Sequence, residues 1–123
     1  MNAGEQEQRH GRAHIDRALC AGRLTQMLLG KGHRRIGVLA PPEQGEAFDA
    51  VRDAAQRLAP DAHVQSVELE SLASAVEAGM SGLIVDGFRL AQEAVVSLRR
   101  HGIDVPARVS VGAMGIDTGG STR

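Results

Sequence analysis

Hydrophobic residues follow helical spacing first and strand spacing next. From Asp16 to Leu28, apolar residues recur three or four positions apart, which predicts an amphipathic helix. Asp16 is suited to capping the start of this helix, and the glycines at positions 30 and 32 are suited to ending it. A continuously apolar run, residues 36–40, then ends at two prolines, which indicates a short strand buried on both faces.

The same helix and strand units repeat along the rest of the chain. Helical spacing covers residues 48–58, 72–76 and 90–98, and strand patterns cover 64–69, 82–85 and 109–111. Such alternation predicts parallel strands joined by right-handed crossovers, with helices on both faces of the sheet. We therefore predict a three-layer α/β/α fold with a mostly parallel sheet of about four strands.

Both ends of the chain differ from this pattern. Residues 1–13 are polar and aperiodic, and residues 113–123 are rich in glycine, serine and threonine. We expect both to be flexible tails around one folded lobe over residues 14–112.

Composition excludes several classes of protein. The 123 residues carry a formal net charge of −1 and contain neither Trp nor Tyr, which argues against a nucleic-acid-binding surface of the domain itself. Cys20 is the only cysteine, so an internal disulfide and a cysteine-rich zinc site are excluded. The polar N-terminus and the lack of a long apolar run predict a cytoplasmic protein without a membrane segment.

Catalysis and cofactor binding find little support in the sequence. Ligands of parallel α/β folds bind beyond the carboxyl ends of the strands. The turn after the first predicted strand holds Pro41, Pro42 and a single glycine, whereas a phosphate-binding loop needs several free backbone N–H groups. We expect no enzyme activity, no cofactor and no metal site.

Asp86 ends a predicted buried strand, where receiver domains carry their phosphorylated aspartate. That chemistry also needs an acidic pair after the first strand and a lysine after the last one. Pro41 and Pro42 occupy the first place, and Lys31, the only lysine, belongs to another part of the chain. Asp86 is therefore interpreted either as a cap of the following helix or as a ligand contact.

Two segments resemble a known family. Gly-His-Arg-Arg-Ile-Gly-Val-Leu at residues 32–39 resembles the Gly-His-Arg-Arg-Ile signature of LacI/GalR-type transcriptional regulators. Gly-Ile-Asp-Val-Pro-Ala-Arg-Val-Ser-Val at residues 102–111 resembles the Gly-Ile-x-Val-Pro-x-x-Ile-Ser-Val segment of the same family. Both occur in the family's order, and the resemblance extends over residues 16–111.

The resemblance implies a sensor domain related to periplasmic sugar-binding proteins. In that family two α/β lobes close on a small effector, often a sugar or a nucleobase, and a helix-turn-helix binds DNA. This chain matches the second lobe only, so we expect DNA contact only through a helix-turn-helix outside it. We also expect a homodimer. The alternative is a stand-alone protein-interaction or dimerisation domain with a decayed effector site.

Family site positions transfer partly to this chain. The resemblance implies that Arg52 contacts the effector, although Ala55 replaces the glycine that usually follows three residues later. A charge solvated beside Asp49 or Asp53 is the alternative for Arg52. Asp16 matches an aspartate that borders the family's cleft.

The remaining site positions follow the later strands. Asp86 and Phe88 lie where the family's strand ends in residues that face the ligand, but Gly87 and Phe88 replace its Asn-Asp pair. After the last strand the family's Gly-Phe-Asp is absent, and Asp117 is a shifted substitute at best. The predicted ligand-binding set is Asp16, Arg52, Asp86 and Phe88.

Overall fold

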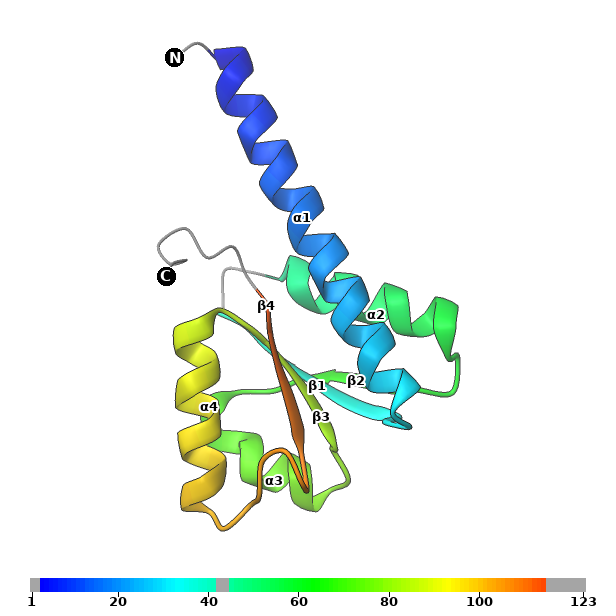
Figure 1. The fold of residues 1–123 in the computed structure, drawn as a ribbon, viewed down its shortest axis with the longest axis vertical. Coiled ribbons are helices and arrows are strands. Elements are labelled where there is room, and N and C mark those ends of the chain that lie inside the picture. The colour runs from blue at the N-terminus through cyan, green and yellow to red at the C-terminus, as the bar shows by residue number, and fades with distance from the viewer. Residues whose placement is uncertain (1–2, 42–44, 115–123) are drawn as a thin grey trace.

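A four-stranded parallel sheet forms the centre of the protein in a computed structural model (Figure 1). The structure describes the backbone of residues 3–41 and 45–114, and the side chains from Arg17 onward within these ranges. The elements in chain order are α1 (Ala3–Gly30), β1 (Arg35–Leu39), α2 (Glu46–Leu58), β2 (His63–Ser66), the 3-10 helix η1 (Leu69–Ser71), α3 (Leu72–Glu77), β3 (Gly82–Asp86), α4 (Phe88–Arg100) and β4 (Ser110–Met114). The predicted α/β class and the parallel sheet of about four strands are confirmed.

The strand order β2-β1-β3-β4 brings three carboxyl ends together. Leu39 of β1 lies beside Val85 of β3, and Asp86, the last residue of β3, lies beside Met114 of β4. Because all strand pairs are parallel, these ends share one edge of the sheet. Asp86 is thus placed at the centre of this edge.

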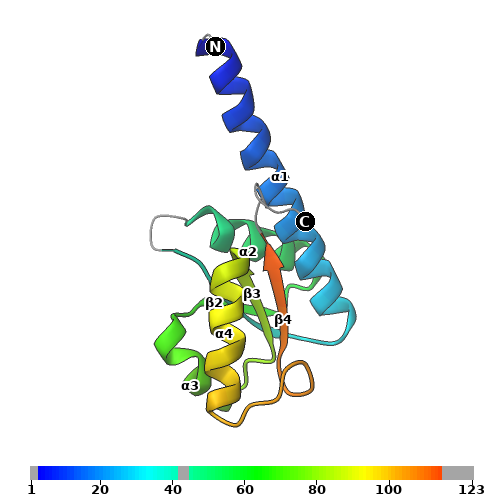
Figure 2. The same cartoon turned by 60° about the vertical axis from the view of Figure 1, so that its left-hand side comes forward.

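Helices cover both faces of the sheet, as Figures 1 and 2 show. Successive side chains of a strand point to opposite faces, so Leu83 and Val85 pack in one cluster with residues of α3 and α4. Ile84 points the other way and packs with residues of α1 and α2. All five residues of β3 are buried, which explains why its sequence shows no polar alternation.

α1 differs from the prediction at its start. The helix begins at Ala3 and runs without a break to Gly30, so Asp16 lies inside it and is not its N-cap. Residues 3–13 are helical where the sequence predicted a flexible tail, and this half of α1 projects away from the sheet (Figures 1 and 2). Whether the lobe as a unit begins at residue 14 stays a prediction.

Two strands differ from their predicted bounds. The predicted strand 64–69 ends at Ser66, and the chain then enters η1. There the Ser71 hydroxyl donates to the Glu68 carbonyl (3.1 Å) and accepts from the Glu68 N–H (3.2 Å). This local bonding turns the chain into η1. The last strand extends to Met114, past the predicted end of the lobe at residue 112, and the rest of the predicted tail lies outside the described residues.

Gly112 explains why β4 can continue. A Cβ atom at this position would lie 3.0 Å from Cδ2 of Leu24, so the absence of a side chain lets α1 pack closely on the strand. The sequence pattern assigned this glycine to the edge of a loose tail. Its role in packing depends on a residue nearly ninety positions earlier, which local patterns do not reveal.

Candidate functional site

Asp86 is the most unusual charged residue of the carboxyl edge. Its side chain is only 5% exposed, and its Oδ2 atom accepts no hydrogen bond. Gly87 follows it with φ of +123°, a conformation that glycine adopts readily, and its N–H donates to the Met114 carbonyl. The chain therefore turns from β3 into α4 directly after Asp86 and keeps the carboxylate at the strand end.

Arg17 of α1 connects Asp86 to α2. Its Nη1 atom lies 3.7 Å from Oδ2 of Asp86 and 3.6 Å from Oε1 of Glu46, the first residue of α2. The side chain of Arg17 is 23% exposed, so it is partly accessible to solvent. Three elements that are distant in the sequence thus meet through one arginine.

Burial sets the protonation behaviour of this aspartate. Removal from water raises the pKa of the Asp86 carboxyl, the Arg17 guanidinium lowers it by a smaller amount, and the Glu46 carboxylate raises it. Because the net direction is upward, the single arginine does not fully compensate the buried charge. Such perturbed groups cluster at functional sites.

A groove of about 530 Å³ lies next to this cluster, between α1 and α2. Arg17, Ala18, Gly45, Glu46, Asp49, Ala50 and Asp53 line it. Its volume falls within the range of about 300–1,000 Å³ that is typical of small-molecule sites. The groove therefore offers space for a small ligand beside Arg17 and Glu46. Asp86 contacts Arg17 but does not itself line the groove.

Arg52, a predicted ligand contact, lies on α2 with 44% of its side chain exposed. Its Nη2 atom is 3.4 Å from a carboxylate oxygen of Asp49 and 3.4 Å from one of Asp53, and the guanidinium lies 5.7 Å from the Phe48 ring centroid. These contacts agree with the alternative of a solvated helix charge. The contact with an effector stays a prediction.

The other predicted site residues have different outcomes. Phe88 begins α4 beside Asp86 and is 48% exposed, so its ring is available near the carboxyl edge. Asp16 lies within α1, and its side chain is outside the described residues, as is Asp117. Ala55 is 1% exposed and packs in the core of α2, so its methyl group fills space under the helix.

Sequence reasoning missed Arg17 and Glu46. Arg17 directly follows the predicted Asp16, and Glu46 begins the helix after the first strand, but each reads as a surface charge. The spatial proximity of α1 and α2 makes them partners, and a single sequence contains no signal for this proximity. Arg17 and Glu46 come together because α1 and α2 cover the same face of the sheet.

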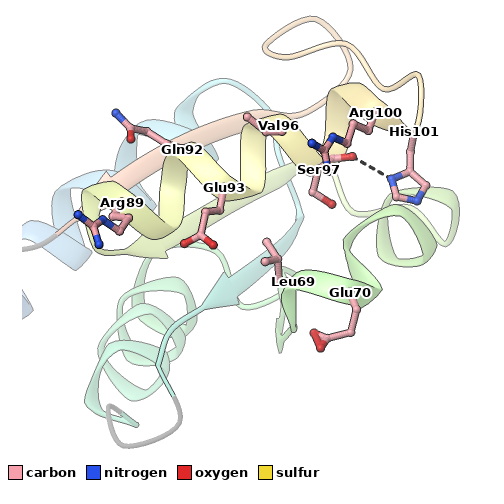
Figure 3. A pocket seen from close by; sticks show the side chains of 9 residues that line it. All are labelled: Leu69, Glu70, Arg89, Gln92, Glu93, Val96, Ser97, Arg100 and His101. Atoms are coloured by element: carbon pink, nitrogen blue, oxygen red, sulfur yellow. Dashed lines mark hydrogen bonds between the residues drawn. The ribbon is translucent and has the colours of Figure 1, made fainter.

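A second groove lies on the opposite helical layer, between α4 and η1 (Figure 3). It measures about 590 Å³ and is lined by Leu69, Glu70, Arg89, Gln92, Glu93, Val96, Ser97, Arg100 and His101. Arg89 and Arg100 lie at opposite ends of α4, and the His101 ring bonds the Ser97 carbonyl at 2.8 Å (Figure 3). Its charged groups do not converge on one point, so we favour the groove beside Asp86.

The described residues were compared with the requirements of a metal site and of a membrane-spanning helix. Within the described part of the chain, no three His, Cys, Asp or Glu side chains are placed to hold a metal ion together. Among the same residues, no helix combines the length and the apolar character needed to cross a membrane.

Comparisons with known proteins agree with the fold and with the two sequence motifs. Residues 25–119 match the family of periplasmic binding protein-like domains. A comparison with curated protein sequences finds no match.

Similar solved structures include three LacI-family proteins. A LacI-family regulator from Corynebacterium glutamicum has a TM-score of 0.63 and 17% identity, with 78% of this chain and 44% of that chain covered. A periplasmic binding protein/LacI regulator from Alkaliphilus metalliredigens, complexed with D-xylulofuranose, has a TM-score of 0.65 and 22% identity, with 84% and 43% covered. A LacI-family regulator from Enterococcus faecium with bound ribose has a TM-score of 0.62 and 18% identity, with 78% and 41% covered.

This chain therefore spans less than half the length of these structures. The match to the family extends over most of its residues and includes both motifs. On these grounds, the chain belongs to the family of periplasmic binding protein-like domains, and it shares its fold with part of the LacI-family regulators.

Proposed function

We propose that this chain is the effector-sensing lobe of a LacI/GalR-like transcriptional regulator, with no catalytic activity of its own. The main support is the buried Asp86 carboxylate at the carboxyl end of β3, beside a groove of about 530 Å³. Related structures hold D-xylulofuranose and ribose, which favours a small polyhydroxylated effector. In this proposal the protein is cytoplasmic, and DNA contact comes from a helix-turn-helix outside these 123 residues.

Asp86 suits such a role because its carboxylate is costly to bury and accepts no hydrogen bond at Oδ2. Oδ2 is closed off from solvent and Asp86 does not line the groove, so a ligand hydroxyl or N–H would supply the missing donor only by displacing Arg17. The interaction would then be strong because the acceptor is charged. Arg17 and Glu46 would hold the carboxylate in place from α1 and α2. Phe88, exposed at the start of α4, would offer an apolar face to a ring.

A dye-based thermal shift with pentoses, hexoses, nucleosides and amino acids tests this function. Dye detection is required because the chain has no Trp or Tyr. A ligand at about a hundred times its dissociation constant stabilises by about 2.7 kcal/mol, which is roughly ten degrees for a domain of this size. We expect Asp86→Asn to abolish the shift and Asp104→Asn, an exposed loop variant, to retain it. A flat screen on a folded sample would contradict effector sensing.

The alternative of an interaction or dimerisation domain rests on a different surface. An apolar groove of about 480 Å³ follows α4 and the edge strand β4, and Val96, one of the residues that line it, is 49% exposed. An antiparallel pairing of α4 with a second copy, centred on Val96, would place Glu93 opposite Arg99 of the partner subunit. This surface is therefore our candidate for the expected homodimer.

Light scattering after size-exclusion chromatography tests the dimer. We expect Val96→Glu to give a monomer and Leu58→Glu, an exposed position on α2, to leave the mass of the wild-type dimer unchanged. A wild-type chain that is monomeric at high concentration would contradict this assembly.

A further inference from the structure

The outer edge of β4 carries unpaired backbone groups. β4 is the last strand in the order β2-β1-β3-β4, so it pairs with β3 on one side only. The Ser110 N–H donates to the carbonyl that precedes β3, and the Met114 carbonyl accepts from the N–H that follows β3, so both residues direct their backbone groups toward β3. Backbone groups of successive strand residues alternate between the two sides. Val111 and Ala113 therefore direct their N–H and C=O groups outward, and within the described residues no group bonds them.

The two edges of the sheet differ in their protection against further pairing. Edge strands of natural proteins are usually blunted by charged residues, prolines or bulges. β2, at the opposite edge, carries exposed polar side chains at His63 and Ser66. β4 has the sequence Ser-Val-Gly-Ala-Met, which contains neither a charge nor a proline, and its register with β3 is unbroken over all five residues. β4 is therefore the edge at which another strand can add.

Apolar side chains border this edge on both layers. On the α4 side, Val111 and Ala113 line the apolar groove of about 480 Å³. On the α1 side, Leu24 packs over Gly112, and Met27, about one helical turn later, is 51% exposed. Apolar side chains that remain exposed in one patch mark an interaction surface. Both the backbone groups and the side chains of this edge are thus suited to a further strand.

The open groups of β4 are complementary to their own copy. A two-fold axis at Gly112 places Val111 of one chain opposite Ala113 of the partner subunit. In an antiparallel ladder such a pair exchanges both of its N–H···O bonds, so each open N–H and C=O finds a partner. The two copies of Gly112 then form the closer pair without hydrogen bonds, where Cα atoms lie only about 4.5 Å apart and neither residue has a side chain to clash. A symmetric contact between identical surfaces requires this self-complementarity.

We propose that β4 pairs antiparallel with β4 of a second copy about a two-fold axis at Gly112, so that two four-stranded sheets join into one. No charged side chain lies on the strand, so the pairing brings no like charges together. Val96 of α4 lines the same groove as Val111, so the contact of α4 with its copy continues this interface. The inference rests on the homodimer proposed above and specifies which backbone groups form it.

Amide hydrogen exchange, measured by NMR at two protein concentrations, tests this pairing. With about nine-tenths of the chains paired, exchange of the Val111 and Ala113 amides should be about tenfold slower than in a dilute, monomeric sample. The outward amides of the opposite edge, at Val64 and Ser66, are the matched control and should exchange fast at both concentrations. A dimer that uses α4 alone would leave all four amides unchanged.

A proline variant then blocks the edge. Proline is tolerated at an edge position whose N–H points outward, but it removes that donor. Ala113→Pro should give a monomer in light scattering, whereas Ser66→Pro at the opposite edge should keep the mass of the wild-type dimer. Circular dichroism confirms that each variant is folded. If Ala113→Pro does not fold, hydrogen exchange of the wild-type chain decides the question.

Different failures have different meanings. If the wild-type dimer exchanges its Val111 and Ala113 amides as fast as the monomer does, or if folded Ala113→Pro is still a dimer, the strand pairing is overturned while the dimer through α4 stands. If these amides are slow in a monomeric chain, another segment of the same chain fills the edge and the inference is also overturned. A chain that stays monomeric at high concentration with fast exchange would contradict both the pairing and the homodimer, and would leave the edge to a strand of another protein.

Discussion

Replacing Asp86 by asparagine should stabilise the protein at neutral pH. The substitution removes a buried negative charge and keeps nearly the same shape. Arg17 retains its second partner, because Glu46 stays 3.6 Å away. Most substitutions of buried residues destabilise a domain, so a gain at this position would identify a group retained for binding.

The magnitude follows from the environment of Oδ2. A buried acceptor without a hydrogen bond costs about 1–3 kcal/mol. The asparagine amide is itself only partly paired in this place, so we expect a gain at the lower end, about 1 kcal/mol. For a domain of this size, that raises Tm by roughly 4 °C.

The gain should also depend on pH. The pKa of Asp86 is raised above its ordinary value of 3.8, so the folded state binds this proton more tightly than the unfolded state does. Below pH 3.8 both states are protonated and the cost of the charge is absent. As pH rises through the raised pKa, the cost appears, and at neutral pH it is complete.

Thermal and urea denaturation followed by far-ultraviolet circular dichroism measure this effect, with wild-type protein and Asp86→Asn compared between pH 7 and pH 4. The advantage of the variant should shrink as the pH is lowered. A Tm that falls by several degrees at pH 7 would refute the reasoning. Asp86 would then anchor α1 through Arg17, and its burial would be a structural requirement.

Two further predictions concern stability. The His33 ring forms hydrogen bonds with the hydroxyls of Ser81 (2.8 Å) and of Ser110, the first residue of β4 (3.2 Å). Burial, and to a smaller extent the charge of Lys31, lowers the pKa of His33 below its ordinary value of 6.5. The unfolded state therefore binds this proton more tightly, so the free energy of unfolding should fall as the pH drops below 6.5. His33→Asn should reduce this acid sensitivity in urea titrations, whereas His101→Asn should not; equal curves for all three proteins would contradict it. Gly22→Ala adds a methyl group to open space in α1 and should stabilise by up to about 1 kcal/mol. Gly37→Ala directs its methyl group into the side chain of buried Met80 and should destabilise the protein by about 1–3 kcal/mol. Equal Tm values for the two alanine variants would refute this packing argument.

The pattern of apolar and polar residues predicted the helices and strands well where the apolar positions follow a clear run or a clear helical spacing. The strand 82–85 is apolar throughout because both of its faces are covered, and the observed β3 adds only Asp86. The predicted helix 90–98 lies within α4, which begins two residues earlier. The predicted ends of two strands were wrong, at places where a serine or a glycine determines the local course of the backbone. Ser71 closes the 3-10 turn that occupies the end of one predicted strand, and Gly112 lets α1 pack closely on another strand.

The candidate site was less predictable than the fold. Asp86 was found because a charged residue at the end of an apolar strand is conspicuous in a sequence. Arg17 and Glu46 belong to helices separated by a strand, and their common contact arises only when both pack on one face of the sheet. Burial was also hard to predict for single residues. Met27 falls at an apolar position of the helical spacing, but its side chain is 51% exposed.

The unbroken helix α1 gives the contact between Arg17 and Asp86 a mechanical consequence. From Arg17 to Ala3 the helix axis is about 21 Å long, at about 1.5 Å per residue, and this part projects beyond the sheet. A tilt of about 5° with its pivot at Arg17 displaces the far end by about 2 Å. The projecting half of the helix therefore carries any change of tilt at Arg17 outward, and its far end moves by more than the length of a covalent bond.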